Sequence, residues 1–266
     1  MRLASGKGQM KDQRHWRLLD SSSKDPAMNL AIEEAILRCR LEGKSPDTLR
    51  FWRNPPSVII GCFQIPWEEV NPAICKELGI SVFRRASGGG AVYHDYGNLN
   101  YSLIIHKSSL EANLDDVEKS YDIFCSGVIE GLRMLGVNAY NRGNSIMIGE
   151  RKISGSAQHR LYDVILHHGT LMVNVDLHAL EHALNLSNVE RQLVNLKTAL
   201  SENVSLSKIK KAIVKGFEKT LNVKFKKGSL SPEEWQAAKM LRSIKYGTSK
   251  YIFNRVVETK PRAVDY

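Results

Sequence analysis

The chain has 266 residues, 42% of them hydrophobic, and a formal net charge of +10. This length allows one large core or two small ones, and no apolar run is long enough to cross a membrane. Residues 1–14 are basic and polar with no apolar stretch, so we expect a flexible arm rather than a secretory signal there. The cysteines show no CxxC spacing, which favours reduced thiols and a cytoplasmic location over disulfides or a zinc site.

The positive charge alone would permit binding to nucleic acid. However, the basic residues are spread along the chain among acidic ones, and no nucleic-acid-binding motif accompanies them. A basic enzyme that acts on a small acidic carrier protein needs the same charge balance, because opposite potentials speed the encounter. We therefore expect a protein partner, and neither nucleic acid nor a membrane.

The hydrophobic periodicity predicts strands in runs with helices set between them. Asp25 before Pro26 predicts the start of the first helix, and Ser231 with Glu234 predicts a capping box at the start of the last. This pattern favours an α+β fold with a mixed, largely antiparallel central sheet flanked by helices. The other predicted helices cover residues 73–78, 114–135, 176–184 and 205–221, and the predicted strands cover residues 49–52, 57–62, 80–84, 99–105, 137–140, 145–148, 152–157, 164–168, 170–175 and 223–226.

The most informative stretch is residues 83–102, FRRASGGGAVYHDYGNLNYS. Three consecutive glycines lose much conformational entropy on folding, so a chain keeps them where the backbone passes close to another group. Arg84 and Arg85 precede them, and guanidinium groups beside exposed amides suit a phosphate or a carboxylate. The alternative is a plain hairpin loop with basic flanks.

A second stretch, GERKISGSAQ, covers residues 149–158, and HHGTL follows at residues 167–171. Lys152 comes directly after a turn and enters a segment of small residues that leaves room for a ligand. A lysine in that position can hold a charged oxygen, although it can equally be a solvated surface charge.

Taken together and in this order, RRASGGGAVYHD, GERKISGSAQ and HHGTL resemble the lipoate–protein ligase family, within the biotin/lipoate ligase and octanoyltransferase superfamily. The resemblance runs from about Trp16 to Tyr246. It implies the catalytic fold shared with biotin ligases and class II aminoacyl-tRNA synthetases, here as one domain over residues 15–266. Many relatives carry a further small C-terminal domain, so we expect either a separate accessory protein or an enzyme limited to part of the reaction.

The resemblance also implies a reaction. ATP, with Mg²⁺, activates lipoate or octanoate to an acyl-adenylate, and a lysine of a lipoyl carrier then displaces AMP. The expected carriers are the E2 lipoyl domains of 2-oxoacid dehydrogenases and the glycine-cleavage H protein. Lys152 matches the catalytic lysine, as an electrostatic stabiliser of the adenylate oxygens. The matching substrate and adenylate-binding positions are Arg85, Ser87, Gly88, Gly89, Gly90, His94, Asn98, Ser154, Gly155, Ser156, Ala157, His168, Gly169 and Thr170. For His94 and His168, a structural hydrogen-bonding role remains the alternative.

One departure from the family pattern concerns the metal. Many relatives have Asn-Asp shortly before the lysine, whereas this chain has Asn144-Ser145, so Mg²⁺ would depend more on phosphates and water.

The alternative function is octanoyl transfer between carriers through a cysteine thioester, without ATP. The cysteine transferases closest in overall sequence place their nucleophile between the long helix and the lysine strand, and residues 136–151 contain no cysteine here. Cys62 is the only candidate thiol, and it is alternatively a buried strand residue. A non-catalytic binder of lipoyl proteins or nucleic acid, and a biotin ligase, are less well supported by the glycine stretch and Lys152.

Overall fold

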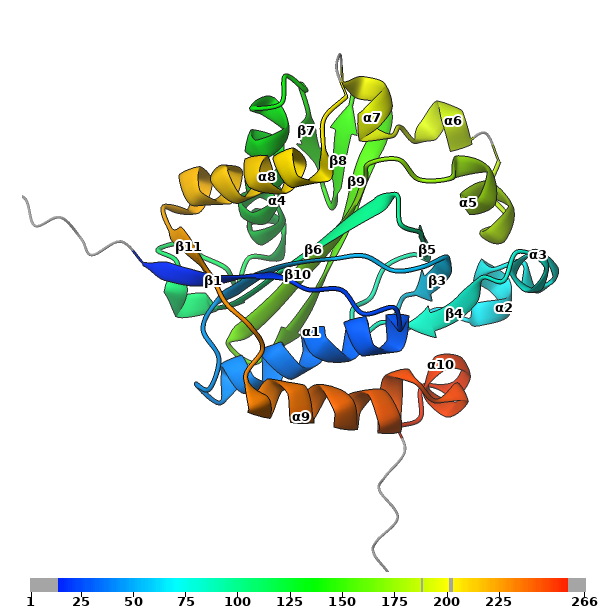
Figure 1. Ribbon diagram of the computed structural model, residues 1–266, viewed down its shortest axis with the longest axis horizontal. Helices are drawn as coiled ribbons and strands as arrows, with labels where there is room; N and C mark the ends of the chain where they lie inside the picture. Colours follow the sequence, from blue (N-terminus) through cyan, green and yellow to red (C-terminus); the bar gives the residue numbers. More distant parts are fainter. Residues whose placement is uncertain (1–13, 188, 201–202, 258–266) are drawn as a thin grey trace, which may run out of the picture.

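The computed structural model describes residues 14–187, 189–200 and 203–257, so residues 1–13 of the expected N-terminal arm lie outside the described residues. An eight-stranded sheet with strand order β11-β1-β2-β6-β10-β9-β8-β7 runs through the centre of the fold (Figure 1). Its strands are β1 His15–Asp20, β2 Thr48–Trp52, β6 Asn98–His106, β7 Tyr140–Arg142, β8 Ser145–Ile148, β9 Arg151–Leu161, β10 Val164–Met172 and β11 Lys224–Lys227.

The direction of the strands confirms the expected mixed, largely antiparallel sheet. β1 runs parallel to both β2 and β11, whereas β2, β6, β10, β9, β8 and β7 pair antiparallel in turn. The long strand β10 is paired along its length with β6 on one side and β9 on the other. The residues of β9 and β10 therefore occupy the middle of the sheet, where backbone hydrogen bonds hold them on both sides.

A second, three-stranded sheet has the order β4-β3-β5, with β3 Ser57–Ile60, β4 Ser81–Arg84 and β5 Val92–His94. β3 pairs parallel to β4 and antiparallel to β5. The glycine stretch connects β4 to β5. It thus forms a loop at the end of the small sheet and faces the large one.

The main helices are α1 Pro26–Leu41, α4 Val117–Arg133, α8 Leu206–Leu221 and α9 Pro232–Leu241. The Asp25 side chain caps α1, and Ser231 and Glu234 form the predicted capping box at the start of α9. The shorter helices are α2 Pro66–Glu69, α3 Pro72–Glu77, α5 Leu177–Ala183, α6 Val189–Gln192, α7 Leu196–Ala199 and α10 Ser249–Asn254, with a 3₁₀ turn at Lys107–Ser109 and a π turn at Arg242–Tyr246.

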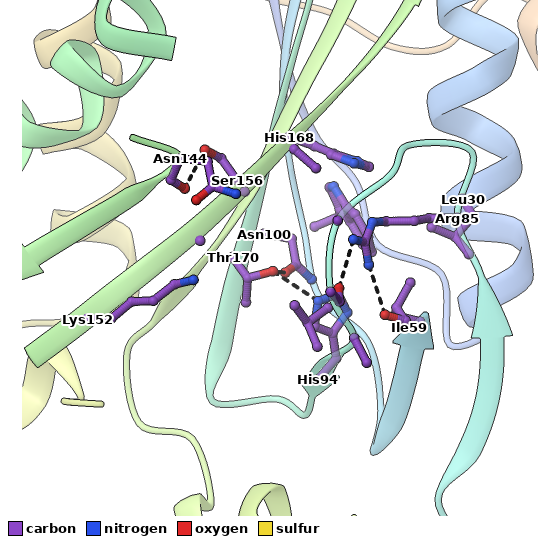
Figure 2. A pocket seen from close by; sticks show the side chains of 18 residues that line it. Leu30, Ile59, Arg85, His94, Asn100, Asn144, Lys152, Ser156, His168 and Thr170 are labelled. Atoms are coloured by element: carbon purple, nitrogen blue, oxygen red, sulfur yellow. Dashed lines mark hydrogen bonds between the residues drawn. The ribbon is translucent and has the colours of Figure 1, made fainter. Parts of the chain in front are cut away.

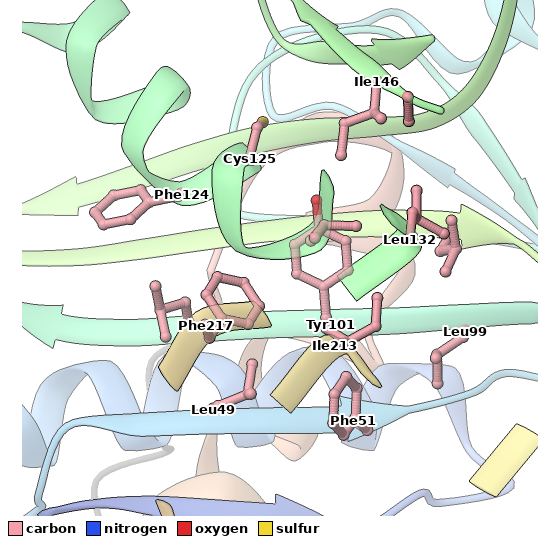
Figure 3. Packing of buried hydrophobic residues seen from close by; sticks show 14 of the residues in the cluster. Leu49, Phe51, Leu99, Tyr101, Phe124, Cys125, Leu132, Ile146, Ile213 and Phe217 are labelled. Atoms are coloured by element: carbon pink, nitrogen blue, oxygen red, sulfur yellow. The ribbon is translucent and has the colours of Figure 1, made fainter. Parts of the chain in front are cut away.

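Helices cover both faces of the large sheet (Figure 1). On one face, α4 and α8 pack over a core that includes Phe51, Phe124 and Phe217 (Figure 3). On the other, α1 and α9 pack over a second core that includes Trp52. Phe51 and Trp52 are consecutive residues of β2 and point to opposite faces, as the alternation of a strand requires.

Several predicted boundaries were wrong. Residues 137–140 are not a strand: Val137 and Ala139 are buried in the first core, but only Tyr140 belongs to β7. Burial without ladder hydrogen bonds is enough to produce an apolar run of this kind. The two predicted strands at residues 164–168 and 170–175 are the single strand β10, which ends at Met172. The long helix begins at Val117 rather than at residue 114, because Asp116 caps it.

Candidate active site

A cavity of about 130 Å³ lies between the glycine loop (residues 88–90) and the central strands β9 and β10 (Figure 2). Strand β6, the start of α1 and the small sheet complete its walls. The lining residues are Leu30, Trp52, Ile59, Arg85, Gly89, Gly90, Ala91, Val92, His94, Asn100, Asn144, Lys152, Gly155, Ser156, Ala157, His168, Gly169 and Thr170.

The structure thus gathers most of the predicted site residues around one cavity, although the predictions came from separate stretches of sequence. The predicted residues that line it are Arg85, Gly89, Gly90, His94, Lys152, Gly155, Ser156, Ala157, His168, Gly169 and Thr170. The predicted residues outside the lining are Ser87, Gly88, Asn98 and Ser154, together with Cys62.

Lys152 lies near the start of β9, and its side chain extends toward the cavity (Figure 2). Burial lowers the pKa of its ammonium group. Among the described residues, no carboxylate forms an ion pair with it. Its backbone is fixed, since the Lys152 carbonyl accepts a hydrogen bond from Val194 N at 3.0 Å. The side chain is therefore a half-buried cation available to an anionic ligand.

Arg85 is buried behind the glycine loop and organises it. Its Nη2 donates to the carbonyls of Gly88 at 2.6 Å and Gly90 at 2.8 Å. Its Nη1 donates to Ile59 O at 3.0 Å (Figure 2). Its Nε donates to Ser87 Oγ at 3.0 Å. Burial lowers the pKa of Arg85 to about 10, which leaves the guanidinium charged at neutral pH. Every nitrogen of Arg85 is thus engaged by the loop and β3.

The expectation that Arg84 faces an anion was wrong. Its guanidinium is buried among backbone carbonyls, with donations to Gln64 O at 2.8 Å and Ile252 O at 2.8 Å, and others to Tyr251, Gly61 and Cys62. Arg84 is the last residue of β4, where consecutive side chains point in opposite directions. It therefore connects α10 to the segment that follows β3.

His94 is a buried, neutral residue in a fixed tautomer. Burial, then the charge of Arg85, lower its pKa to about 3. Asn54 Nδ2 donates to His94 Nδ1 at 3.1 Å, so the proton sits on Nε2, which donates to Thr170 Oγ1 at 3.0 Å. The His94 ring therefore orients the Thr170 hydroxyl while it lines the cavity.

The chain of hydrogen bonds from His94 through Thr170 ends at Asn100, a residue that the sequence did not identify. Thr170 Oγ1 donates to Asn100 Oδ1 at 2.9 Å (Figure 2). Asn100 lines the cavity, and its buried Nδ2 has no hydrogen-bond partner among the described residues. A buried donor without a partner costs free energy, so it is suited to a ligand oxygen. No sequence motif marked Asn100, and only its place on β6 opposite Thr170 reveals it.

Ser87 and His168 form part of a further buried network. Ser87 Oγ lies 2.6 Å from His168 Nε2, and His168 Nδ1 lies 3.0 Å from Glu33 Oε1. Ser102 Oγ donates to the same Glu33 oxygen at 2.5 Å. Sequence reasoning missed Glu33, which is on α1 and 135 residues from His168 in the chain.

Asn144 and the apolar side chains Leu30, Trp52, Ile59 and Val92 were also missed as lining residues. Asn144 was noted only for its place before Ser145. Its carbonyl accepts from Ser156 N at 2.8 Å and from Ser156 Oγ at 3.0 Å, which brings it to the cavity beside β9. The apolar side chains form the hydrophobic part of the cavity lining.

The predicted residues outside the cavity lining are buried or half-buried in the surrounding structure. Asn98 Nδ2 donates to Tyr93 O at 3.2 Å, and Ser154 is fully buried on β9. Cys62 is half-buried, and its backbone N–H donates to Ser87 O at 2.8 Å. The Cys125 sulfur lies 3.8 Å from Ser156 Oγ, and burial raises the pKa of this thiol to about 11. No described cysteine therefore lines the cavity.

In the described part of the chain, no group of three or more His, Cys, Asp or Glu side chains is placed to hold a metal ion. No carboxylate lines the cavity either, as far as the described residues go. In the same residues, no helix has both the length and the apolar character of a membrane span.

Comparisons with known proteins show the family to which the chain belongs. The family model of the lipoyl protein ligase A/B catalytic domain matches residues 25–218. An octanoyltransferase LipM from Anoxybacillus flavithermus is 32% identical over 275 residues, covering 90% of this chain and 98% of that protein.

Two solved structures are similar over most of the chain. A lipoate-protein ligase A bound with ATP has a TM-score of 0.83 and 31% identity, covering 91% of this chain and 100% of that one. A bi-partite lipoate protein ligase from Thermoplasma acidophilum, described with its E2 lipoyl domain, has a TM-score of 0.83 and 30% identity, covering 93% of this chain and 100% of the other.

Proposed function

Because the chain belongs to the lipoyl protein ligase A/B catalytic-domain family, we propose that it is an ATP-dependent lipoate–protein ligase. It activates lipoate or octanoate to the acyl-adenylate and transfers the acyl group to a lysine of a lipoyl carrier domain. The observation that carries this proposal is Lys152, a half-buried cation without a carboxylate partner among the described residues, in a cavity bounded by the glycine loop. The proposal takes residues 15–266 as one catalytic domain.

The first step joins two anions, so its charge must be neutralised. The carboxylate oxygen of the acid attacks the α-phosphorus of ATP, and pyrophosphate leaves. The Lys152 ammonium stabilises the negative charge on the phosphate and carbonyl oxygens, and its lowered pKa reflects the dry setting in which such a charge acts strongly. Leu30, Trp52, Ile59 and Val92 offer the acyl chain an apolar wall.

In the second step, the amine of the carrier lysine attacks the acyl carbonyl, and AMP leaves. Negative charge develops on the carbonyl oxygen. Lys152 and the unpartnered Asn100 Nδ2 are the donors on the cavity wall that can meet it. The glycine loop limits the access of water to the mixed anhydride, which would otherwise hydrolyse.

The described side chains do not form a magnesium site of their own at the cavity, because no carboxylate lines the described wall. Mg²⁺ prefers oxygen ligands and keeps several waters, so we propose that it enters with the phosphates of ATP. No step above depends on it.

We propose lipoyl domains of 2-oxoacid dehydrogenase E2 subunits or the glycine-cleavage H protein as acceptors, and a reducing cytoplasm as the location. The similarity to the Thermoplasma acidophilum ligase, described with an E2 lipoyl domain and as bi-partite, supports such an acceptor and a separate accessory protein. The net charge of +10 suits an acidic carrier.

The test is pyrophosphate release from ATP by the purified chain with lipoate or octanoate and no carrier present. Release together with an acyl-adenylate identified by mass spectrometry would support ligation. If no pyrophosphate appears even with the accessory protein added, the ligase proposal fails.

A second candidate is ATP-independent octanoyl transfer, and the similarity to LipM favours it. An octanoyl thioester is already activated, so this reaction needs a nucleophile rather than a nucleotide. The position of Cys62 outside the cavity lining gives this candidate no thiol at the site among the described residues. We therefore place it second.

A further inference from the structure

We propose that Glu33 is a positioning residue, which fixes the tautomer of His168 and through it the hydroxyl of Ser87 at the base of the glycine loop. The three residues come from α1, β10 and the segment after β4. They are 2%, 8% and 0% exposed, respectively, so water does not compete for their hydrogen bonds. The effect on catalysis rests on the proposed function, whereas the effect on the tautomer and the loop does not.

The direction of each hydrogen bond follows from the two ends of the network. At one end, Arg85 Nε can only donate, and it donates to Ser87 Oγ at 3.0 Å. At the other, the Glu33 carboxylate can only accept. The remaining protons then have one consistent arrangement: Ser87 O–H donates to His168 Nε2 at 2.6 Å, and His168 Nδ1–H donates to Glu33 Oε1 at 3.0 Å. His168 is therefore neutral, with its proton on Nδ1.

The carboxylate at the end of this network is held in its ionised form. Burial by itself raises the pKa of Glu33, but the hydrogen bonds from His168 and Ser102 and the charge of Arg50 lower it below its usual value. A hydrogen bond to a charged acceptor is stronger than one between neutral groups. Glu33 thus selects the Nδ1–H tautomer over the alternative.

The glycine loop is attached to the other end of the same network. Arg85 bridges Ser87 Oγ to the carbonyls of Gly88 and Gly90, and the Ser87 carbonyl accepts from Cys62 N at 2.8 Å. If His168 adopts the Nε2–H tautomer, its ring donates to Ser87 Oγ, which then receives two donors. The Ser87 proton is left with no acceptor among the described residues, a cost that loosens the loop.

The arrangement has the order of a Ser-His-Glu catalytic triad, but it does not present a nucleophile. Ser87 is fully buried and does not line the cavity, and its oxygen already accepts from Arg85. The geometry instead makes the network a support for the loop residues Gly89 and Gly90, which do line the cavity.

The test uses the full chain and ¹⁵N NMR of its histidine rings. In the wild type, His168 is expected as the Nδ1–H tautomer. Glu33→Gln offers both a carbonyl and an amide to the ring, so the Nε2–H tautomer should become populated. The Cys62 amide donates a hydrogen bond to the Ser87 carbonyl, so its hydrogen-exchange rate reports whether Ser87 is in place. This rate should rise about tenfold, while the amides of the β9–β10 ladder stay protected from exchange.

Ser102→Ala is the matched control. It removes the other hydrogen bond to the same Glu33 oxygen but leaves the path from Glu33 through His168 to Ser87 intact. The tautomer and the exchange of the Cys62 amide should remain as in the wild type. An Nε2–H tautomer in the wild type, or equal loosening by Ser102→Ala and Glu33→Gln, would overturn the proposal.

Should Glu33→Gln not fold, Ser87→Ala breaks the network at its other end. It should raise the hydrogen-exchange rate of the Cys62 amide by a similar factor. An exchange rate in Ser87→Ala equal to that of the wild type would refute the role of the network. In the ligase assay, a loop ordered about ten times less often should raise KM for the acid and ATP about tenfold with little change in kcat. Absence of pyrophosphate release from the wild type, even with the accessory protein added, would refute the proposed function and leave the NMR result standing.

Discussion

The side chain of Lys152 lies directly over Gly155, three residues further along β9. A Cβ atom added at Gly155 would be 2.7 Å from Lys152 Nζ and 2.8 Å from its Cε, closer than real Cβ atoms approach other groups. Gly155 has an ordinary strand conformation, so its value at this position is the space it leaves. The absence of a side chain at Gly155 therefore allows the Lys152 ammonium group to occupy its place in the cavity wall.

Lys152→Ala should abolish acyl-adenylate formation, with a fall of about 100-fold or more, because it removes a preorganised charge from the site. The protein should remain folded, since no described side chain depends on the ammonium group. Pyrophosphate release and circular dichroism measure the two effects. Arg151→Ala, which changes the exposed neighbour, should keep wild-type activity. Full activity in Lys152→Ala would show that the site is assigned to the wrong lysine.

Gly155→Ala should reduce adenylate formation while leaving the melting temperature nearly unchanged, because the new methyl group displaces only the end of a flexible side chain. The double variant with Lys152→Ala should be no less active than Lys152→Ala alone. This non-additivity is the sign that both changes act through the same ammonium group. Independent, additive losses would mean that Gly155 serves the ligand directly.

His167→Phe should make the protein less sensitive to acid. His167 is fully buried beside Tyr101, Tyr121 and Phe124, and burial is the main cause that lowers its pKa to about 3. The unfolded chain binds this proton at about pH 6.5, so stability is lost as the pH falls from 6.5 toward 3.

For one such histidine, the loss between pH 7 and pH 5 is about 2 kcal/mol. Urea unfolding at both pH values should show the loss in the wild type and a difference smaller by about that amount in His167→Phe. His94, which has the same direction of shift, continues to contribute in the variant. The exposed His178 provides a control, and His178→Ala should behave as the wild type. An undiminished pH dependence in His167→Phe would contradict burial of the neutral ring.

Cys62→Ser should keep activity within about twofold of the wild type, because the hydrogen bonds of Cys62 near the site are made by its backbone N–H and carbonyl. After incubation with an octanoyl carrier and no ATP, mass spectrometry should find no acyl group on Cys62. An acyl-cysteine there, with loss of transfer in Cys62→Ser, would reverse the order of the two proposed functions.

The parts of the fold and site that could be predicted are those with a local signal. The capping box of α9 and the glycine loop are each written within a few consecutive residues, and both appeared where expected. Glu33 could not be found in this way, because its partner His168 is 135 residues away and the contact exists only once α1 packs on the sheet. Asn100 is similar, since its significance depends on its register with Thr170 across two strands.

Arg84 shows a different limit. The sequence places it beside Arg85, and the shared charge suggested a shared role. Consecutive side chains along a strand point in opposite directions, so the two guanidinium groups lie apart. Arg85 donates to the glycine loop, whereas Arg84 is surrounded by carbonyls from α10 and the segment after β3.

The pairing of β10 with both β6 and β9 has a consequence for how the cavity admits its ligand. On that side, movement would require breaking a continuous backbone ladder in the middle of the sheet. On the opposite side, the glycine loop is held by the guanidinium of Arg85 and, at its base, by the hydrogen bonds of Ser87. Opening of the cavity therefore requires only a few side-chain hydrogen bonds of the loop to break. The strands of the sheet stay in place and keep the reacting atoms aligned.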